Sequence, residues 1–219
     1  MATHSLAELA DKLFCAVISD CLDQAGIWKQ AFPTRIRPLD ESLVMVGRAR
    51  TALYMDVYAE TPGENPYELE IALIDSLKPG EIPVFSCGMT GRVAPWGELL
   101  STASKYRGAA GAVMDGCVRD IKAIRAMKFP VFHGGIAPLD SKGRGTCKAI
   151  DVPIECAGVA VSPGDLVFGD ADGIVVIPKA KEDEVLKLAF KKISGEKNTL
   201  RDLQAGESLG SVFAKYGIL

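Results

Sequence analysis

The stretch from Ile82 to Phe132 alternates short apolar runs with longer amphipathic ones: IPVFSC at 82–87, ELLSTASKY at 98–106, GAVM at 111–114, RDIKAIRAM at 119–127 and PVF at 130–132. Short apolar runs predict buried strands, and the longer runs have the length and apolar spacing of helices. Strand, helix, strand, helix, strand is the order of right-handed crossover units in a parallel sheet. The stretch therefore predicts an α/β fold.

The segments on either side extend this pattern. Upstream, we expect a helix from Leu6 to Gln24, one or two strands over 43–54 broken near Gly47, and a helix that begins after Asn65-Pro66 and ends at 78–80. Downstream, we expect strands at 150–154, 158–161, 166–168 and 174–177 and a helical tail over 179–205. Nothing resembling a linker or a repeat interrupts the chain. We therefore expect one domain over residues 1–219, a mixed sheet with helices packed on it.

Composition excludes several classes of protein. The chain has 219 residues, 48% of them hydrophobic and 24% charged, which is typical of a soluble globular protein. The net charge is -3, so there is no basic excess for a nucleic-acid backbone. No apolar run is long enough to span a membrane, and the first residues lack the apolar core of a signal peptide. We expect a cytoplasmic protein with reduced thiols, without nucleic-acid or membrane partners.

Two predicted helix starts follow neighbouring strands, at Gly97-Glu98-Leu99-Leu100 and at Arg119-Asp120. Ligands of open parallel sheets bind beyond the carboxyl ends of strands, where free amides of helix starts attract anions. A cation in the first turn of a helix opposes the helix dipole, so Arg119 suggests an anionic ligand held by its guanidinium together with the amides of Leu99 and Leu100. A surface pair between Arg119 and Asp120 is an equally weighted alternative.

Glu98 and Asp120 also allow two interpretations. Acidic residues at helix starts commonly do no more than complement the dipole. Alternatively, the two carboxylates form an oxygen-rich site for Mg²⁺ or Mn²⁺. A zinc site is not expected, because the chain has only two histidines, His4 and His133, and no Cys/His cluster.

The spacing of these residues resembles a family signature. Gly97-Glu98-Leu99-Leu100, twenty further positions and Arg119-Asp120 resemble the acidic-x20-Arg-Asp motif of the RraA-like family, which includes the regulator of ribonuclease activity A and 4-hydroxy-4-methyl-2-oxoglutarate aldolases. The flanking sequences agree over most of the chain: 108–111, 138–140, 163–166 and 172–178. The resemblance implies the swivelling β/β/α fold of phosphohistidine domains, assembled as a homotrimer or homohexamer.

The resemblance also implies roles for particular residues. Pyruvate would be bound at Gly97 to Leu100 through the amides of Leu99 and Leu100, and by Arg119. Asp120 would bind Mg²⁺ (or Mn²⁺) directly, and Glu98 through water. Glu196 best matches a glutamate that reaches the metal's waters from a neighbouring subunit. Glu98 stands where many family aldolases have Asp, and His133 and the turn at 140–144 lie where contacts to the rest of the substrate would vary.

Two functions follow from the resemblance. The first is a divalent-metal-dependent aldolase or lyase that cleaves a 4-hydroxy-2-oxo acid to release pyruvate, with oxaloacetate decarboxylase side activity. Arg119, Asp120 and Glu196 would be its catalytic residues; a Schiff-base route is disfavoured, because no lysine lies in a plainly apolar strand. The second is a non-enzymatic regulator that binds ribonuclease E or an RNA helicase. Glu98, Arg119, Asp120 and Glu196 together favour the enzyme.

Overall fold

A curved, mixed sheet forms the centre of the protein in the computed structural model, which describes residues 4–88 and 90–217. Its strand order is β1-β6-β4-β3-β2-β11-β12, and β8 pairs with a further part of β2. The strands are β1 (Arg37–Pro38), β2 (Met45–Asp56), β3 (Glu81–Ser86), β4 (Ala112–Met114), β6 (Val131–His133), β8 (Gly145–Ile150), β11 (Leu166–Asp170) and β12 (Gly173–Ile177). The expected α/β class with a mixed sheet is confirmed.

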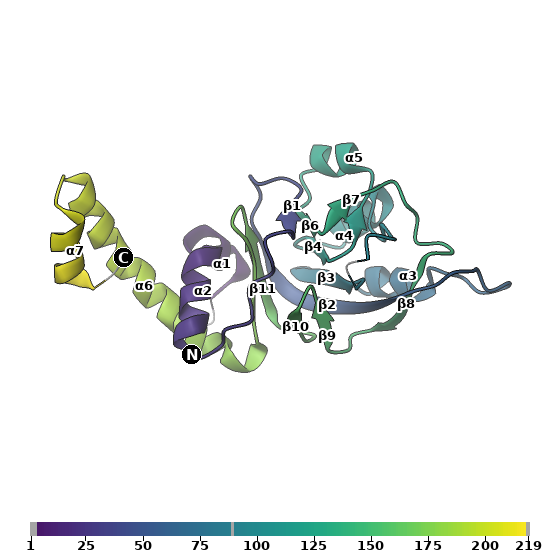
Figure 1. Cartoon of the computed structure of the whole chain (residues 1–219), viewed down its shortest axis with the longest axis horizontal. Helices are drawn as coiled ribbons and strands as arrows, with labels where there is room; N and C mark the ends of the chain where they lie inside the picture. The colour runs from purple at the N-terminus through teal and green to yellow at the C-terminus, as the bar shows by residue number, and fades with distance from the viewer. Residues whose placement is uncertain (1–3, 89, 218–219) are drawn as a thin grey trace.

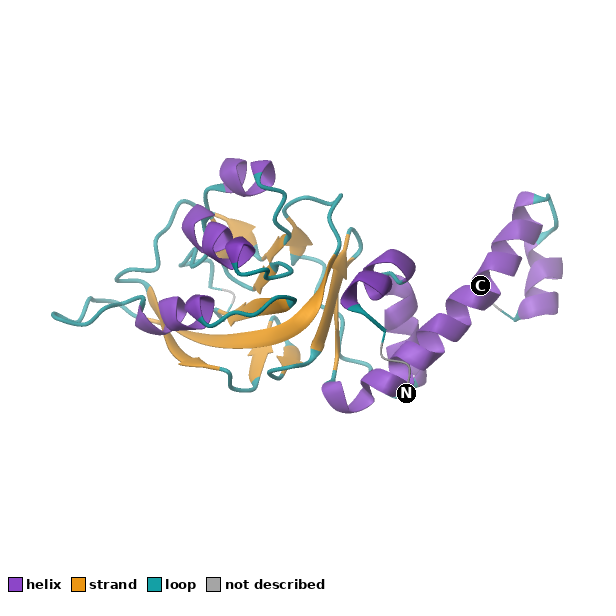
Figure 2. Ribbon diagram, turned by 180° about the vertical axis from the view of Figure 1, so that it is seen from behind, coloured by secondary structure: helices purple, strands orange, loops and turns teal. Residues whose placement is uncertain are grey.

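The parallel part of the sheet is built from crossover units. Strands β2, β3, β4 and β6 run parallel to one another. Helices α3 (Glu68–Asp75), α4 (Glu98–Tyr106) and α5 (Ile121–Ala126) connect them and pack on one side of the sheet (Figures 1 and 2). The helix predicted over 98–106 is confirmed with the same bounds. This connectivity brings the starts of α4 and α5 to the same edge of the sheet, as the order of strands and helices predicted.

The sheet curls until its two outer strands nearly meet. β1 pairs antiparallel with β6, whereas β11 and β12 continue antiparallel from β2. The segment just before β1 bridges to β12 between Ala31 and Val175, and the amide of Phe32 donates to the carbonyl of Ile174 at 2.9 Å. The result is an almost closed barrel with two small ladders beside it: β5 (Cys117–Val118) with β7 (Gly135–Ile136), and β9 (Ile154–Cys156) with β10 (Val159–Val161).

Side chains alternate between the inside and the outside of this barrel. In β2, Met45 and Ala49 pack in the inner core, whereas Ala52 and Tyr54 pack outward against α3 to α5. Val46, also facing outward, belongs to a third core under the terminal helices. β2 thus contributes to all three cores and pairs with three strands, β3, β8 and β11.

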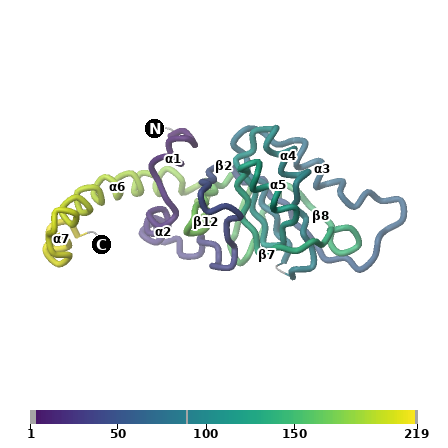
Figure 3. The backbone as a smooth tube through the Cα atoms, turned by 90° about the horizontal axis from the view of Figure 1, so that it is seen from above, coloured from purple at the N-terminus to yellow at the C-terminus, as the bar shows by residue number. Residues whose placement is uncertain are grey.

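The terminal helices cover β11 and β12 from outside. They are α1 (Leu6–Lys12), α2 (Cys15–Gln24) and α6 (Glu182–Gln204), which follows the short 3-10 turn η1 (Lys179–Lys181) and leads to α7 (Leu209–Tyr216). The far half of α6 extends away from the barrel and carries α7 folded back on it (Figures 1 and 3). None of the helices in the described residues has the length and apolarity needed to cross a membrane.

The structure corrects three sequence predictions. The helix expected over 6–24 is broken at Leu13 and Phe14, because the amide of Cys15 donates to the carboxylate of Asp170 and begins a second helix there. The segment expected over 43–54 as one or two strands is a single strand, β2, which continues through Gly47 without a break. The strand expected over 150–154 is interrupted: Ile150 ends β8, Ile154 begins β9, and the residues between them form a turn with Asp151 in the left-handed region (φ 55°).

Candidate active site

A cavity of about 300 Å³ lies where the starts of α3 and α4 meet the segment before α5. Five of the residues predicted from sequence line it: Gly97, Leu99, Leu100, Arg119 and Asp120. Its other lining residues are Tyr67, Glu70, Ile71, Pro95, Asp140 and Ser141. The motif at 97–120 is therefore assembled into one site, although Glu98 contributes its backbone and not a wall of the cavity.

Adjacent strands bring the two halves of the motif together. β3 and β4 are neighbours in the sheet, and their extensions beyond the sheet also pair, through a parallel bridge between Trp96 and Val118. The amide of Arg119 donates to the carbonyl of Trp96 at 2.9 Å. Trp96 is fully buried, and its indole nitrogen donates to Ser101 at 2.7 Å. The backbone of the site is thus anchored on a rigid aromatic residue.

Asp120 has an unusual conformation at the start of α5. It is the N-cap residue of that helix, but it lies in the left-handed region (φ 58°, ψ 32°) and its side chain does not cap its own helix. Its Oδ2 instead accepts a hydrogen bond from the amide of Glu98, the first residue of α4, at 3.2 Å. Backbone strain of this kind is typical of functional sites, because surrounding contacts must hold it in place.

This geometry corrects the helix-dipole argument for Arg119. The helix expected from residue 119 begins at Ile121, so Arg119 lies outside its first turn and does not oppose the dipole. The alternative, a surface pair with Asp120, is also wrong: within the described residues the ion pair of Arg119 is with Asp140, at 3.3 Å between Nη2 and Oδ1. Its Nε is buried and has no hydrogen-bond partner among those residues. Arg119 therefore has a donor at Nε that no described residue satisfies, and its side chain, 39% exposed, lines the cavity.

Gly97 leaves room for these side chains. A Cβ atom at this position would lie 2.6 Å from Oδ2 of Asp120 and 3.4 Å from Nε of Arg119. The backbone of Gly97 is extended (φ -152°), so the requirement for glycine comes from the space and not from its torsion angles. The next two residues after Glu98 carry first-turn amides, which have no acceptor inside their own helix. The cavity thus combines free amides, a guanidinium and a carboxylate.

Sequence reasoning missed Tyr67 and Glu70, and it included Asp140 only as part of the turn at 140–144. Asp140 Oδ2 accepts from the hydroxyl of Tyr67 at 2.6 Å, and its Oδ1 accepts from the amide of Ser141 at 2.9 Å. Burial, together with the hydrogen bond to Asp140, raises the pKa of Tyr67 to about 12. Glu70 is only 5% exposed and accepts from the hydroxyl of Tyr54. Burial raises the pKa of Glu70 to about 7.

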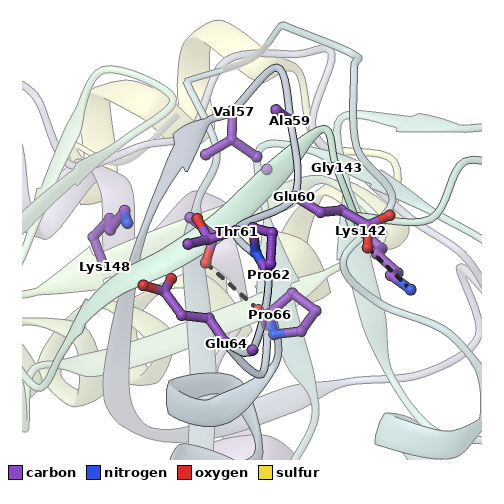
Figure 4. Close-up of a pocket in the computed structure, with 13 residues that line it drawn as sticks. Val57, Ala59, Glu60, Thr61, Pro62, Glu64, Pro66, Lys142, Gly143 and Lys148 are labelled. Carbon is purple, nitrogen blue, oxygen red and sulfur yellow. Dashed lines mark hydrogen bonds and ion pairs between the residues drawn. The ribbon is translucent and has the colours of Figure 1, made fainter.

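A second cavity, of about 290 Å³, continues along the same turn (Figure 4). Its walls come from the loop at 57–66 and from Lys142, Gly143 and β8, so it begins where the first cavity ends at Ser141. Lys142 pairs with Glu60 at 3.2 Å. The turn at 140–144 therefore faces both cavities, whereas His133 lies in β6 and lines neither of them.

Within one copy of the chain, Glu196 lies away from this site. It lies on α6 and lines a different, largely apolar cavity of about 610 Å³ with Phe14, Ile193 and Leu200. Figure 1 shows α6 on the opposite side of the molecule from α4 and α5. Among the residues that the structure describes, no three His, Cys, Asp or Glu side chains gather as a set of metal ligands.

Comparison with known proteins agrees with the motif. Residues 15–176 match the family model RraA-like, described as Aldolase/RraA. The chain belongs to the RraA-like family. A relative from Halalkalibacterium halodurans named "Putative 4-hydroxy-4-methyl-2-oxoglutarate aldolase" is 39% identical over 175 residues, which cover 80% of this chain and 77% of that protein.

Solved structures resemble most of the chain. An uncharacterized protein from Pseudomonas syringae has a TM-score of 0.83 and 27% identity, covering 94% of this chain and 95% of its own. RraAS2 of Streptomyces coelicolor, titled an unusual member of the RNase ES inhibitor RraA protein family, has a TM-score of 0.77 and 27% identity, covering 90% and 98%. The family thus includes relatives named for both functions that the sequence suggested.

Proposed function

We propose that this RraA-like protein is a divalent-metal-dependent lyase that cleaves a 4-hydroxy-2-oxo acid to release pyruvate, with oxaloacetate decarboxylase side activity. The observation that carries the proposal is the cavity at 97–120, in which Arg119 keeps a buried Nε without an acceptor in the described residues. The aldolase name of the Halalkalibacterium relative supports the same reaction class.

Arg119 and the start of α4 bind the 2-oxo acid head in this proposal. The guanidinium binds the carboxylate or the 2-oxo oxygen, since it presents several N–H donors in one plane. The first-turn amides of Leu99 and Leu100 donate hydrogen bonds to the remaining anionic oxygens at the positive end of the helix dipole. As negative charge develops on the 2-oxo oxygen, these fixed donors stabilise it, which is commonly the largest contribution to catalysis.

Asp120, Glu98 and Glu196 would hold the metal. Mg²⁺ usually takes one or two carboxylates and keeps several waters, so one direct ligand in Asp120 and water-mediated contacts to Glu98 and Glu196 fit its chemistry. The side chain of Asp120 is exposed at the cavity, and one of its oxygens is held by the amide of Glu98. A bound Mg²⁺ or Mn²⁺ ion supplies Lewis-acid polarisation of the 2-oxo group.

Glu196 would come from a neighbouring copy of the chain. The proposal is therefore a homotrimer or homohexamer in which α6 of one subunit reaches the cavity of the next. Exposed apolar side chains suit burial in such an assembly: Leu200 and Phe213 on the terminal helices, and Phe14 just before α2. Light scattering of the purified protein measures the subunit number, and a monomer with full activity would exclude the role of Glu196.

A coupled assay tests the reaction. Pyruvate release from 4-hydroxy-2-oxo acids and from oxaloacetate is followed with lactate dehydrogenase, before and after EDTA and again after Mg²⁺ or Mn²⁺ is added. We expect turnover to disappear with EDTA and to return with the metal. Full activity in metal-free buffer would contradict the metal dependence, and no activity on any such substrate would contradict the lyase.

The second candidate is a regulator that binds ribonuclease E or an RNA helicase. The Streptomyces relative, named as a member of the RNase ES inhibitor RraA protein family, favours it. A pull-down with purified ribonuclease E separates the two functions, because a regulator requires neither metal nor pyruvate release. Tight binding without lyase turnover would favour the regulator.

A further inference from the structure

Glu70 is a buried carboxyl group in the wall of the cavity whose role the proposed function leaves unassigned. It lies in the first turn of α3 and is 5% exposed. Its Oε2 accepts a hydrogen bond from Tyr54 on β2. Its Oε1 has no hydrogen-bond partner among residues 4–88 and 90–217, and the side chain lines the cavity together with Arg119. A pair with Tyr54 needs one carboxyl oxygen, so the second oxygen is available to a ligand.

The surroundings of Glu70 raise its pKa to about 7, so both the acid and the carboxylate are populated at neutral pH. Burial favours the neutral acid, and the nearby charge of Asp140 acts in the same direction. The hydrogen bond from Tyr54, the charge of Arg119 and the dipole of α3 favour the carboxylate, but burial outweighs them. The remaining titratable groups that face Glu70 are Tyr67, Cys87 and Cys147. Glu70 is thus poised to give and take a proton near pH 7.

Release of pyruvate requires a proton donor in this cavity. When the C3–C4 bond of the substrate breaks, its electron pair leaves an enolate whose C3 must take up a proton. The hydroxyl of Tyr67 already donates to Asp140, and its raised pKa makes it a weak acid. Asp140 accepts from Tyr67 and Ser141 and pairs with Arg119, and Asp120 is assigned to the metal. Among the carboxyl groups that line the cavity, Glu70 therefore remains as the candidate proton donor.

We propose that Glu70 is the catalytic acid that protonates C3 of the pyruvate enolate, an assignment that rests on the proposed function. The O–H bond at Oε1 breaks, a C3–H bond forms, and the enolate electrons restore the 2-oxo carbonyl. Glu70 becomes a carboxylate and regains its proton from water. In aldol cleavage the 4-hydroxyl releases one proton and C3 gains one; in oxaloacetate decarboxylation one proton is taken from solvent as CO₂ leaves. The reverse step exchanges the methyl protons of pyruvate.

Deuterium exchange isolates this step. Wild-type protein, Glu70→Gln and the control Glu68→Gln are incubated with pyruvate and Mg²⁺ in D₂O, and loss of the methyl signal is followed by proton NMR. Glutamine keeps the shape and an acceptor for Tyr54 but cannot donate an acidic proton; Glu68 occupies the same helix turn and is exposed. We expect exchange to fall by about 100-fold or more in Glu70→Gln, with unchanged oxalate binding by calorimetry and wild-type behaviour in Glu68→Gln.

Tyr54→Phe provides a second test. Exchange begins when the carboxylate of Glu70 takes a proton from the methyl group of pyruvate, so the exchange rate rises with pH as Glu70 ionises. Loss of the hydrogen bond from Tyr54 raises the pKa of Glu70, so this rising limb moves to higher pH, and carboxyl-selective ¹³C NMR of metal-free protein follows the same titration directly. Normal exchange in Glu70→Gln beside an active wild type, loss of oxalate binding together with exchange, or an unshifted limb in Tyr54→Phe would each overturn the assignment alone. No turnover and no exchange by wild-type protein would overturn the proposed function as well.

Discussion

The carboxylate of Asp120 accepts a hydrogen bond from the amide of Glu98 at 3.2 Å, although the two residues begin different helices. This contact ties the start of α5 to the start of α4 and removes Asp120 from the capping of its own helix. The two acidic residues of the motif are therefore linked through a backbone amide, and Asp120 makes this contact from a left-handed conformation.

Two substitutions of Asp120 should affect turnover equally but the free energy of unfolding differently, because its backbone is left-handed. Asp120→Ala and Asp120→Gly both remove the carboxylate, so we expect both to abolish metal-dependent turnover. The two variants should differ in their free energy of unfolding, because a Cβ in the left-handed region costs about 1–2 kcal/mol and glycine avoids it. Urea unfolding should show Asp120→Gly to be the more stable variant by about 1 kcal/mol. Equal stabilities would mean that the conformation relaxes when the carboxylate is removed.

Arg119→Lys keeps the positive charge but loses the planar guanidinium, whose N–H groups can bind both oxygens of a carboxylate. Loss of one donor to the developing negative charge should raise the activation barrier by about 2–4 kcal/mol, and kcat/KM should fall roughly 30- to 1,000-fold. Stability should change by less than about 1 kcal/mol, because the pair with Asp140 is partly exposed. Kinetics and thermal melting of the same variant check both. A large fall in Tm with near-normal kinetics would show that Arg119 is a structural residue.

Gly97→Ala should damage the site through crowding alone. The added methyl group would lie 2.6 Å from Oδ2 of Asp120, so the carboxylate must move away from the amide of Glu98. We expect Mn²⁺ affinity, followed by electron paramagnetic resonance, to fall together with turnover. Gly210→Ala in α7 is the matched control, because no heavy atom lies within 4 Å of its added Cβ and the variant should behave as wild type. Unchanged Mn²⁺ binding in Gly97→Ala would show that the site accommodates the methyl group without displacing the carboxylate of Asp120.

Glu70 should make the protein less stable as pH rises from about 4.5 to 7. Its pKa is raised from 4.5 to about 7, so the folded state binds a proton more tightly than the unfolded state over this interval. The stabilising contribution is complete at low pH, declines through the interval and is absent above it, a change of about 3 kcal/mol. Urea unfolding of wild type and Glu70→Gln at several pH values measures the difference. Parallel curves for the two proteins would show that Glu70 has the same pKa in the folded and unfolded states.

Local sequence patterns predicted the helices and strands more successfully than the connections between them. The helix at 98–106 and the parallel strands follow from apolar spacing and glycine positions, both encoded within each segment. The break between α1 and α2 does not, because it depends on a hydrogen bond between Cys15 and Asp170, which are 155 positions apart.

The same distinction applies to the candidate site. The proximity of Gly97, Arg119 and Asp120 could be predicted from the sequence, because these residues follow adjacent strands and share a motif. Asp140 meets Tyr67 from 73 positions away, and Glu70 looks like any acidic residue in a first helical turn until its burial is known. Periodicity carries no information about such long-range polar contacts, so sequence reasoning could not include them.

The long strand β2 has a further consequence for how the protein unfolds. Because its side chains enter the barrel interior, the core under α3 to α5 and the core under the terminal helices, none of these cores can be opened without disturbing a strand that the other two share. Pairing with β3, β8 and β11 adds backbone hydrogen bonds that break in the same event. The barrel and its covering helices should therefore melt as one cooperative unit, with the amides of β2 among the last to exchange with solvent.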